Sequence, residues 1–213
     1  MTAVDDVPRN AAGGPMAPYV TPWTGESVLA ASVTVTTSGV AYADPVLDAH
    51  ARDLDGMLWA LCAGTATGRP EYAAELHPGR QRIAMEGLLC AGCGKPAARD
   101  DRGMLWILPL LDRVVDRPWE DVRSAIPPMC EPCAEVAPML CPRLRKGHVR
   151  LRVREAELIG VRGTLHPRPG APGPPDSDAE VRHDSPEAPF VIARQAVREL
   201  RRTTVVAFLA ATP

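Results

Sequence analysis

Two Cys-x-x-Cys pairs constrain this chain more than any other feature. Cys90 and Cys93 form the first pair, and Cys130 and Cys133 form the second. Two thiolates at this spacing can bind one metal ion, because the tight turn between them directs both sulfur atoms the same way. Two pairs supply the four ligands of a tetrahedral site. The sequence therefore predicts one structural Zn²⁺ ion held by Cys90, Cys93, Cys130 and Cys133.

The residues beside each pair fit this interpretation. Gly94 directly follows the first pair and can adopt the positive φ that a metal-binding knuckle uses. Pro132 lies inside the second pair, and proline is well tolerated in the first turn of a helix, where its missing N–H has no intrahelical partner. We therefore expect Cys133 in the first turn of a helix, where the helix dipole favours a thiolate.

Two further cysteines, Cys62 and Cys141, lie outside the pairs. We interpret both as structural, with Cys62 as a buried small hydrophobic residue at the end of an apolar strand. Cys141, with His148 seven residues later, leaves open an extension of the metal site. Four thiolates already complete a tetrahedron, however, which favours the structural interpretation.

The order of elements around the cysteines resembles a treble-clef zinc finger over residues 88–145. A knuckle comes first, a turn and strand follow at Asp100–Leu108, and a helix opens at the second pair. HNH endonucleases share this knuckle, and the resemblance to them would require a histidine in the hairpin strand. Neither residues 98–106 nor the helix after Cys133 contain one. The resemblance thus implies a zinc ion that stabilises the fold, without metal-dependent cleavage of DNA.

A short segment of the chain occurs twice. Gly56-Met57-Leu58-Trp59 recurs as Gly103-Met104-Leu105-Trp106, each time after an Asp-rich turn. Two interpretations stay open: chance similarity between two turn-and-strand segments, or a duplicated hairpin whose two strands pair in one sheet.

Other patterns predict the remaining elements. Residues 28–42 indicate a β-hairpin around Ser38-Gly39, and residues 80–89 indicate a short helix. Residues 149–154 alternate apolar and basic side chains, as a strand does, and residues 159–165 are its expected partner. Phe190, Ala193, Val197 and Leu200 mark one face of a predicted helix, and a last strand follows at 203–209.

These elements define the predicted organisation. The fold class is α+β, with small antiparallel β-hairpins and short helices around a treble-clef-like zinc site of four cysteines. Residues 1–17 form a disordered tail and residues 18–166 a mixed domain. The Pro- and Gly-rich residues 167–189 form a disordered loop, and residues 190–213 form a helix and strand that pack on the domain.

Composition limits the function classes. The formal net charge is −2, so the chain lacks the strong basic field of a dedicated nucleic-acid binder. The first residues lack the apolar run of a signal peptide, and no stretch is apolar enough to span a membrane. We therefore expect a cytoplasmic location without membrane binding, where cysteines stay reduced and serve as metal ligands. The scarcity of lysine beside abundant arginine, alanine and proline indicates a bacterial source.

The densest basic stretch follows the second pair. Its candidate residues for binding nucleic acid or another anion are Arg143, Arg145, Lys146, Arg150, Arg152 and Arg154. The alternative is a solvated strand face balanced by neighbouring glutamates. We favour the solvated face, because aromatic residues that could stack on bases are scarce.

His77 lies at a predicted helix start, where it could contribute to an anion pocket or simply cap the helix. We favour capping, and no catalytic nucleophile is recognisable. Three functions remain, in order of preference. The first is a zinc-stabilised module that binds a protein partner, and the second is a nucleic-acid binder that uses residues 143–154. The third is an enzyme with a site near His77, and the sequence favours a protein that is not an enzyme.

Overall fold

The computed structural model describes residues 16–110 and 119–210. It confirms the predicted α+β class, with a few short helices, two small antiparallel sheets and one larger mixed sheet. None of the helices within these residues is long and apolar enough to cross a membrane.

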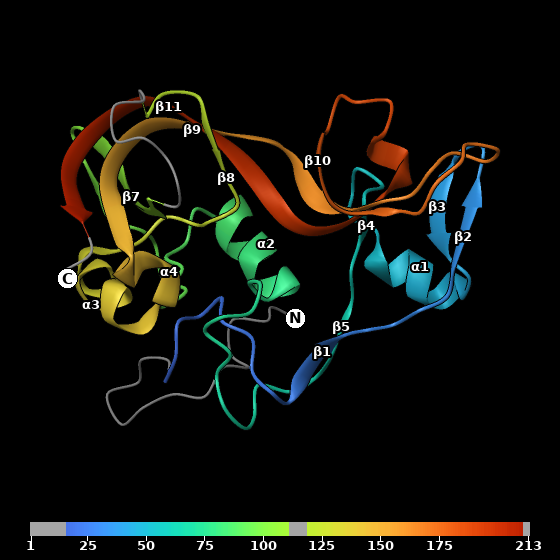
Figure 1. Ribbon diagram of the computed structural model, residues 1–213, viewed down its shortest axis with the longest axis horizontal. Helices are drawn as coiled ribbons and strands as arrows, with labels where there is room; N and C mark the ends of the chain where they lie inside the picture. The colour runs from blue at the N-terminus through green and yellow to red at the C-terminus, as the bar shows by residue number, and fades with distance from the viewer. Residues whose placement is uncertain (1–15, 111–118, 211–213) are drawn as a thin grey trace.

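Two long strands dominate the larger sheet. Strand β9 (Gly147–Leu165) and strand β11 (Val191–Ala210) pair antiparallel along their whole lengths. Figure 1 shows them as a bent ribbon that crosses the molecule. Four other strands pair with one of these two. Strands β7 (Gly103–Pro109) and β10 (Asp176–Arg182) pair with β9, and strands β4 (Leu58–Trp59) and β8 (Val122–Ser124) pair with β11. The short strand β6 (Arg99–Asp100) pairs with β7.

The ribbon connects two groups of elements (Figure 1). At one end lie β7 and the helices α3 (Glu131–Leu140) and α4 (Pro142–Arg145). The opposite end carries the hairpin β2 (Val33–Thr36) and β3 (Gly39–Tyr42), the helix α1 (Pro45–Ala51) and the 3-10 helix η1 (Ala188–Phe190). A separate pair, β1 (Glu26–Val28) with β5 (Cys62–Gly64), lies below them.

Strand β7 is buried on both faces. Leu105 and Ile107 belong to the core that surrounds α3 and the cysteine pairs. Met104 and Trp106 belong to a second core on the opposite face, together with residues of β9 and β11. This alternation follows from the pleat of a strand, which directs successive side chains to opposite faces. Helix α3 and the cysteine pairs thus pack against one face of β7, while the second core covers its other face.

Helix α2 (Pro78–Glu86) lies against the middle of the ribbon, where two polar side chains attach it. Gln81 is fully buried, and its amide accepts from Ala196 N (2.9 Å) and donates to Ala196 O (2.9 Å) and Ala125 O (2.7 Å). Arg198 donates from Nε to the carbonyl of Met85 at 2.8 Å, near the helix end. These contacts satisfy backbone groups that the helix and the ladder leave unpaired.

Several predicted elements are present. The hairpin around Ser38-Gly39 forms from β2 and β3, the helix predicted at 80–89 corresponds to α2, and the alternating strand 149–154 lies within β9. The two copies of Gly-Met-Leu-Trp contribute β4 and β7 to one sheet. They are not neighbours there, because β11 and β9 lie between them.

Other predictions were wrong. Residues 191–210 form strand β11 rather than a helix followed by a strand, and residues 159–165 continue β9 rather than pairing with 149–154. Shifts of register between Ala193 and Gln195, and between Val197 and Arg198, interrupt the period-two pattern that a regular strand would show.

The two segments predicted to be disordered, residues 1–17 and 167–189, also differ from the prediction where the structure describes them. The segment 167–189, predicted to be a disordered loop, contains the strand β10. Pairing with β9 and an ion pair between Arg162 and Asp178 support this strand. Residues 1–15 of the predicted tail lie outside the described residues, and Ala17 is buried in the core.

The attachment of α2 gives a testable prediction. Replacing Gln81 with leucine leaves one N–H and two carbonyls without their partner in a buried place, so the variant should lose about 2–4 kcal/mol of unfolding free energy. Urea denaturation of the metal-loaded protein measures this. Glu86→Gln, which changes an exposed residue of the same helix, should differ from the parent by less than about 1 kcal/mol. Equal stability of Gln81→Leu and the parent would contradict the role assigned to Gln81.

Candidate metal centre

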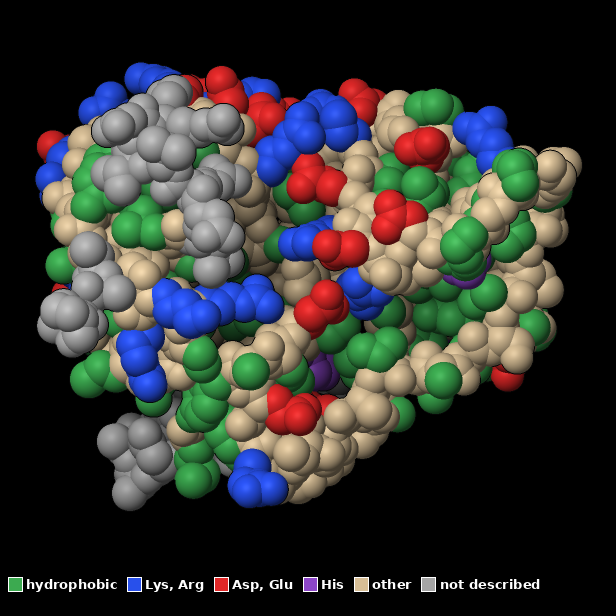
Figure 2. Space-filling model, in the orientation of Figure 1, with side chains coloured by type: hydrophobic (Ala, Val, Ile, Leu, Met, Phe, Trp, Pro, Cys, Tyr) green, Lys and Arg blue, Asp and Glu red, His purple; other side chains and the backbone are tan. Residues whose placement is uncertain are grey.

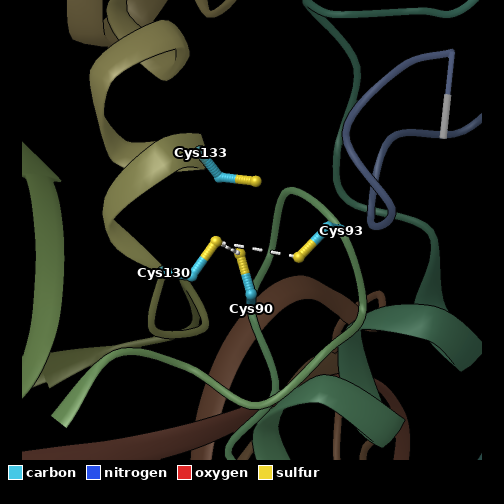
Figure 3. Close-up of side chains that lie close together, drawn as sticks. All are labelled: Cys90, Cys93, Cys130 and Cys133. Carbon is cyan, nitrogen blue, oxygen red and sulfur yellow. Dashed lines mark hydrogen bonds between the residues drawn. The ribbon is translucent and has the colours of Figure 1, made fainter. Parts of the chain in front are cut away.

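The four sulfur atoms of the two Cys-x-x-Cys pairs converge on one point (Figure 3). All four lie within 4.8 Å of one another. The separation is 3.5 Å between the sulfurs of Cys90 and Cys130, and 3.7 Å between those of Cys93 and Cys130. Cys90 is buried, whereas the other three are partly exposed. The cluster is positioned to bind one metal ion, as the cysteine spacing predicts.

Backbone hydrogen bonds shape the first pair into a tight knuckle. Gly92 N donates to the sulfur of Cys90 at 3.3 Å, and Gly94 N donates to the carbonyl of Cys90 at 2.8 Å. Gly94 has the predicted positive φ, at 70°. Donation to a ligand sulfur stabilises its thiolate form, and the turn holds Cys93 beside Cys90.

The second pair opens helix α3. Cys130 is the N-cap residue and Pro132 lies in the first turn, so Cys133 projects from the position that the sequence predicts. The N-terminal end of a helix carries partial positive charge. Both cysteines of this pair therefore lie at the end of α3 that carries partial positive charge.

The protonation of the four thiols depends on how close they lie to one another. The hydrogen bond from the Cys133 thiol lowers the pKa of Cys90 to about 5, and the same bond, together with burial, raises the pKa of Cys133. Burial raises the pKa of Cys93 to about 11. Without a metal the thiols therefore share protons, because several thiolates this close repel one another. A cation among them removes that repulsion and allows all four to ionise.

The knuckle is held by two segments that are distant in the sequence. Tyr19 N and Val20 N donate to the carbonyls of Gly92 and Ala91, at 2.9 and 3.2 Å. Ala91 N donates in turn to Pro128 O at 2.8 Å, just before the second pair. The N-terminal segment and the two ligand pairs thus form one hydrogen-bonded unit.

Cys62, Cys141 and His148 do not belong to the cluster of four. Cys62 begins β5 instead of ending an apolar strand, and burial raises the pKa of its thiol. Cys141 precedes α4 as its N-cap residue, and His148 is buried with Nδ1 3.1 Å from Leu144 O. These positions agree with a structural role.

The basic stretch does not form one uniform face. Arg150 pairs with Glu135 of α3 at 2.7 Å, and Arg152 pairs with Glu131 of α3 and, at 3.2 Å, with Asp100 of β6. The Arg152 side chain is only 9% exposed. The remaining candidates, Arg143, Arg145, Lys146 and Arg154, are exposed. Two of the strand arginines therefore fasten α3 to the sheet, and binding of nucleic acid remains an untested prediction.

His77 caps α2, in agreement with the preferred interpretation. Its Nδ1 accepts from Arg80 N at 3.3 Å, while Nε2 lies 3.5 Å from a carboxylate oxygen of Glu26. Burial lowers the pKa of His77 to about 4. Arg80 is buried as well and pairs with Glu26 at 2.5 Å. Because both ring nitrogens are engaged, neither is available as a base for the neighbouring cavity that contains Cys62.

Sequence reasoning missed Glu26, which pairs with Arg80 from a distant strand, and it missed Tyr19 beside the knuckle. Neither residue belongs to a motif, and both acquire their contacts only through the fold. No signal in the sequence spacing could have identified them.

No protein-family model, no curated protein and no solved structure matches this chain significantly. Function therefore has to be inferred from the residues and their geometry.

Gly92 gives a sharp test of the metal centre. A Cβ atom at this position would lie 2.6 Å from Cys133 Cβ and 2.7 Å from Cys133 Sγ, so Gly92→Ala should displace a ligand and weaken metal affinity about 10- to 100-fold. Competition with a chromogenic chelator measures the affinity. Gly79→Ala is the matched control, since its Cβ would meet nothing closer than 3.5 Å, and it should retain the parent affinity. Unchanged metal affinity of Gly92→Ala would contradict the geometry of the site.

Proposed function

We propose that the metal is Zn²⁺ and that this chain is a zinc-stabilised module that binds a protein partner. The convergence of four cysteine sulfurs supports the zinc assignment. A tetrahedral zinc ion with bonds of about 2.3 Å separates its sulfur ligands by about 3.8 Å. The separations of 3.5 and 3.7 Å match that arrangement. Four protein ligands leave no open coordination position, which is typical of a structural site rather than a catalytic one.

The surrounding elements support a treble-clef-like arrangement. The knuckle is followed by the β6–β7 hairpin and then by α3, with the ligand pairs at the first and last of these elements. Neither the hairpin strands nor α3 contain a histidine. The residues that would act on a phosphodiester in an HNH endonuclease are therefore lacking at the corresponding elements, and we assign the ion a structural role.

Helix α3 supports the proposal of a protein partner. Val136, Met139 and Leu140 are 41%, 64% and 37% exposed. Their spacing places them along one stripe of the helix, whereas Ala134 and Ala137 face the core. An exposed apolar stripe on a helix is typical of a surface that another protein covers. The ligands in the first turn of α3 would hold this stripe in place relative to the sheet.

The cytoplasm is the proposed location, because a reducing compartment keeps the four thiols available to the metal.

The zinc assignment predicts one equivalent of zinc in the purified protein. Cys130→Ser should lose the metal and destabilise the finger by several kcal/mol, since apparent binding of structural zinc is worth about 10–16 kcal/mol in finger peptides. Elemental analysis and thermal denaturation measure both effects. Cys141→Ser, which removes a thiol outside the cluster, should keep the zinc. A parent protein without metal, or a Cys130→Ser protein with full zinc content, would sink the assignment.

The exposed apolar stripe on α3 predicts that a change at Met139 affects partner binding without affecting zinc content. Met139→Glu places a charge in the exposed stripe without touching the core, so a bound protein partner should be lost while zinc content and unfolding temperature stay unchanged. Affinity capture from the source cells, followed by mass spectrometry and a binding assay with the purified partner, measures this. Leu54→Glu is the matched control, because Leu54 is fully exposed elsewhere on the molecule. Identical capture by both variants and the parent would contradict a partner site on α3.

A further inference from the structure

A groove of about 520 Å³ lies beside the middle of the β9–β11 ribbon, away from the four metal ligands. Four arginine side chains line it, and each comes from a different element: Arg123 from β8, Arg143 from α4, Arg162 from β9 and Arg194 from β11. In Figure 2, basic and acidic side chains gather over the middle of the view, where Figure 1 places β8 and the central ribbon. The fold thus brings together four cations that the sequence keeps apart.

The charge of this groove differs from that of the other hollows in the described residues. Its lining has four arginines against two carboxylates, Glu75 and Asp178, a net of two positive charges. A hollow of about 900 Å³ near β3 has one arginine against three carboxylates, and one of about 230 Å³ near β1 has three glutamates and no lysine or arginine. The lining of this groove therefore carries an excess of positive charge in a chain whose net charge is −2.

The arginines are held in place but remain available to a ligand. Arg162 pairs with Asp178, and Arg194 pairs with Glu75 at 3.2 Å. Arg123 pairs at 3.1 Å with Glu180 and at 3.5 Å with Glu199, and neither glutamate lines the groove. The carboxylates of Glu75, Asp178 and Glu180 are exposed, whereas that of Glu199 is only 10% exposed. Exposed ion pairs contribute little to stability, so a ligand oxyanion can replace the three exposed carboxylates. Arg143 has no hydrogen-bonding or ionic partner among the described residues.

The groove is also lined by apolar residues, with Leu76, Leu108 and Val122 among them. Ser124 and Gln195 add neutral hydrogen-bonding groups. The volume falls in the range of roughly 300–1,000 Å³ that is typical of small-molecule sites. Guanidinium groups bind phosphate oxygens in pairs, and two excess positive charges match one phosphate dianion.

We propose that this groove binds a small organic phosphate monoester, of mononucleotide size or less. The phosphate contacts the guanidinium groups, and the organic part lies against the apolar residues of the lining. A nucleic-acid strand fits the lining less well, because Asp178 and Glu75 accompany two of the four arginines and a run of successive phosphates would meet those carboxylates.

Isothermal titration of the full, zinc-loaded chain tests the proposal with three probes: adenosine 5′-monophosphate, inorganic phosphate and adenosine. The monophosphate should bind, inorganic phosphate should bind more weakly, and adenosine should not bind. Arg143→Ala should weaken binding of the monophosphate about tenfold or more, because it removes a charged hydrogen-bond donor. Arg143 is exposed and pairs with no other described residue, so this variant should keep the parent unfolding temperature.

Arg154→Ala is the matched control, because it removes an exposed arginine outside the groove and should leave binding unchanged. Failure of both phosphorylated probes to bind at millimolar concentration would overturn the proposal. An equal loss in Arg143→Ala and Arg154→Ala would do the same, since it would indicate unspecific attraction. Binding of a single-stranded oligonucleotide that Arg143→Ala abolishes, without binding of the monophosphate, would assign the groove to nucleic acid instead.

Discussion

The antiparallel ladder between β9 and β11 is the interaction on which the rest of the structure depends. Strands β4, β7, β8 and β10 each pair with one of these two strands. The ladder contains three shifts of register, and such bulges bend a strand and increase its twist. One ladder can therefore cover the core beside Trp106 at one end and the core around Val161 and Ala193 at the other. The hydrogen bonds of Gln81 with Ala196 and of Arg198 with Met85 then attach α2 to β11.

The candidate metal centre lies at the end of the ribbon that carries α3 and β7. It joins the knuckle to the start of α3, and hydrogen bonds connect both to Tyr19 and Val20. A core of buried residues surrounds α3 and the two pairs, but three of the four cysteines are only partly buried at its edge. Directional bonds to a cation can order such an edge without a larger core. The ion pairs of Arg150 and Arg152 with α3 act on the same helix from the sheet side.

The features that the sequence predicted correctly depend on a residue and its near neighbours. The two-residue spacing brings the sulfurs of each pair together, Gly94 permits the positive φ of a knuckle, and Pro132 suits the first turn of a helix. The structure has all three features as expected. The α+β class follows from the same local patterns. The first part of β11 was predicted as a helix because Phe190, Ala193, Val197 and Leu200 repeat at a helical spacing, whereas residues 203–209 were correctly predicted as a strand. In the strand, residues 195–200 are all buried, since α2 and β8 contact this part of it and bulges interrupt its alternation.

The sequence does not show which residues become partners when they are distant along the chain, and the arginines illustrate this most clearly. Counting charges along residues 143–154 suggested a single basic face, yet Arg150 and Arg152 serve as ties to α3. The arginines that line the central groove lie in four elements, from β8 to β11, and only Arg143 belongs to the stretch that stood out in the sequence. A guanidinium can hold a carboxylate with one edge and still offer donors along another, because it carries five N–H groups in a plane. The same residue type can thus fasten a helix at one place and line an anion site at another, and only the partners that the fold supplies distinguish the two roles.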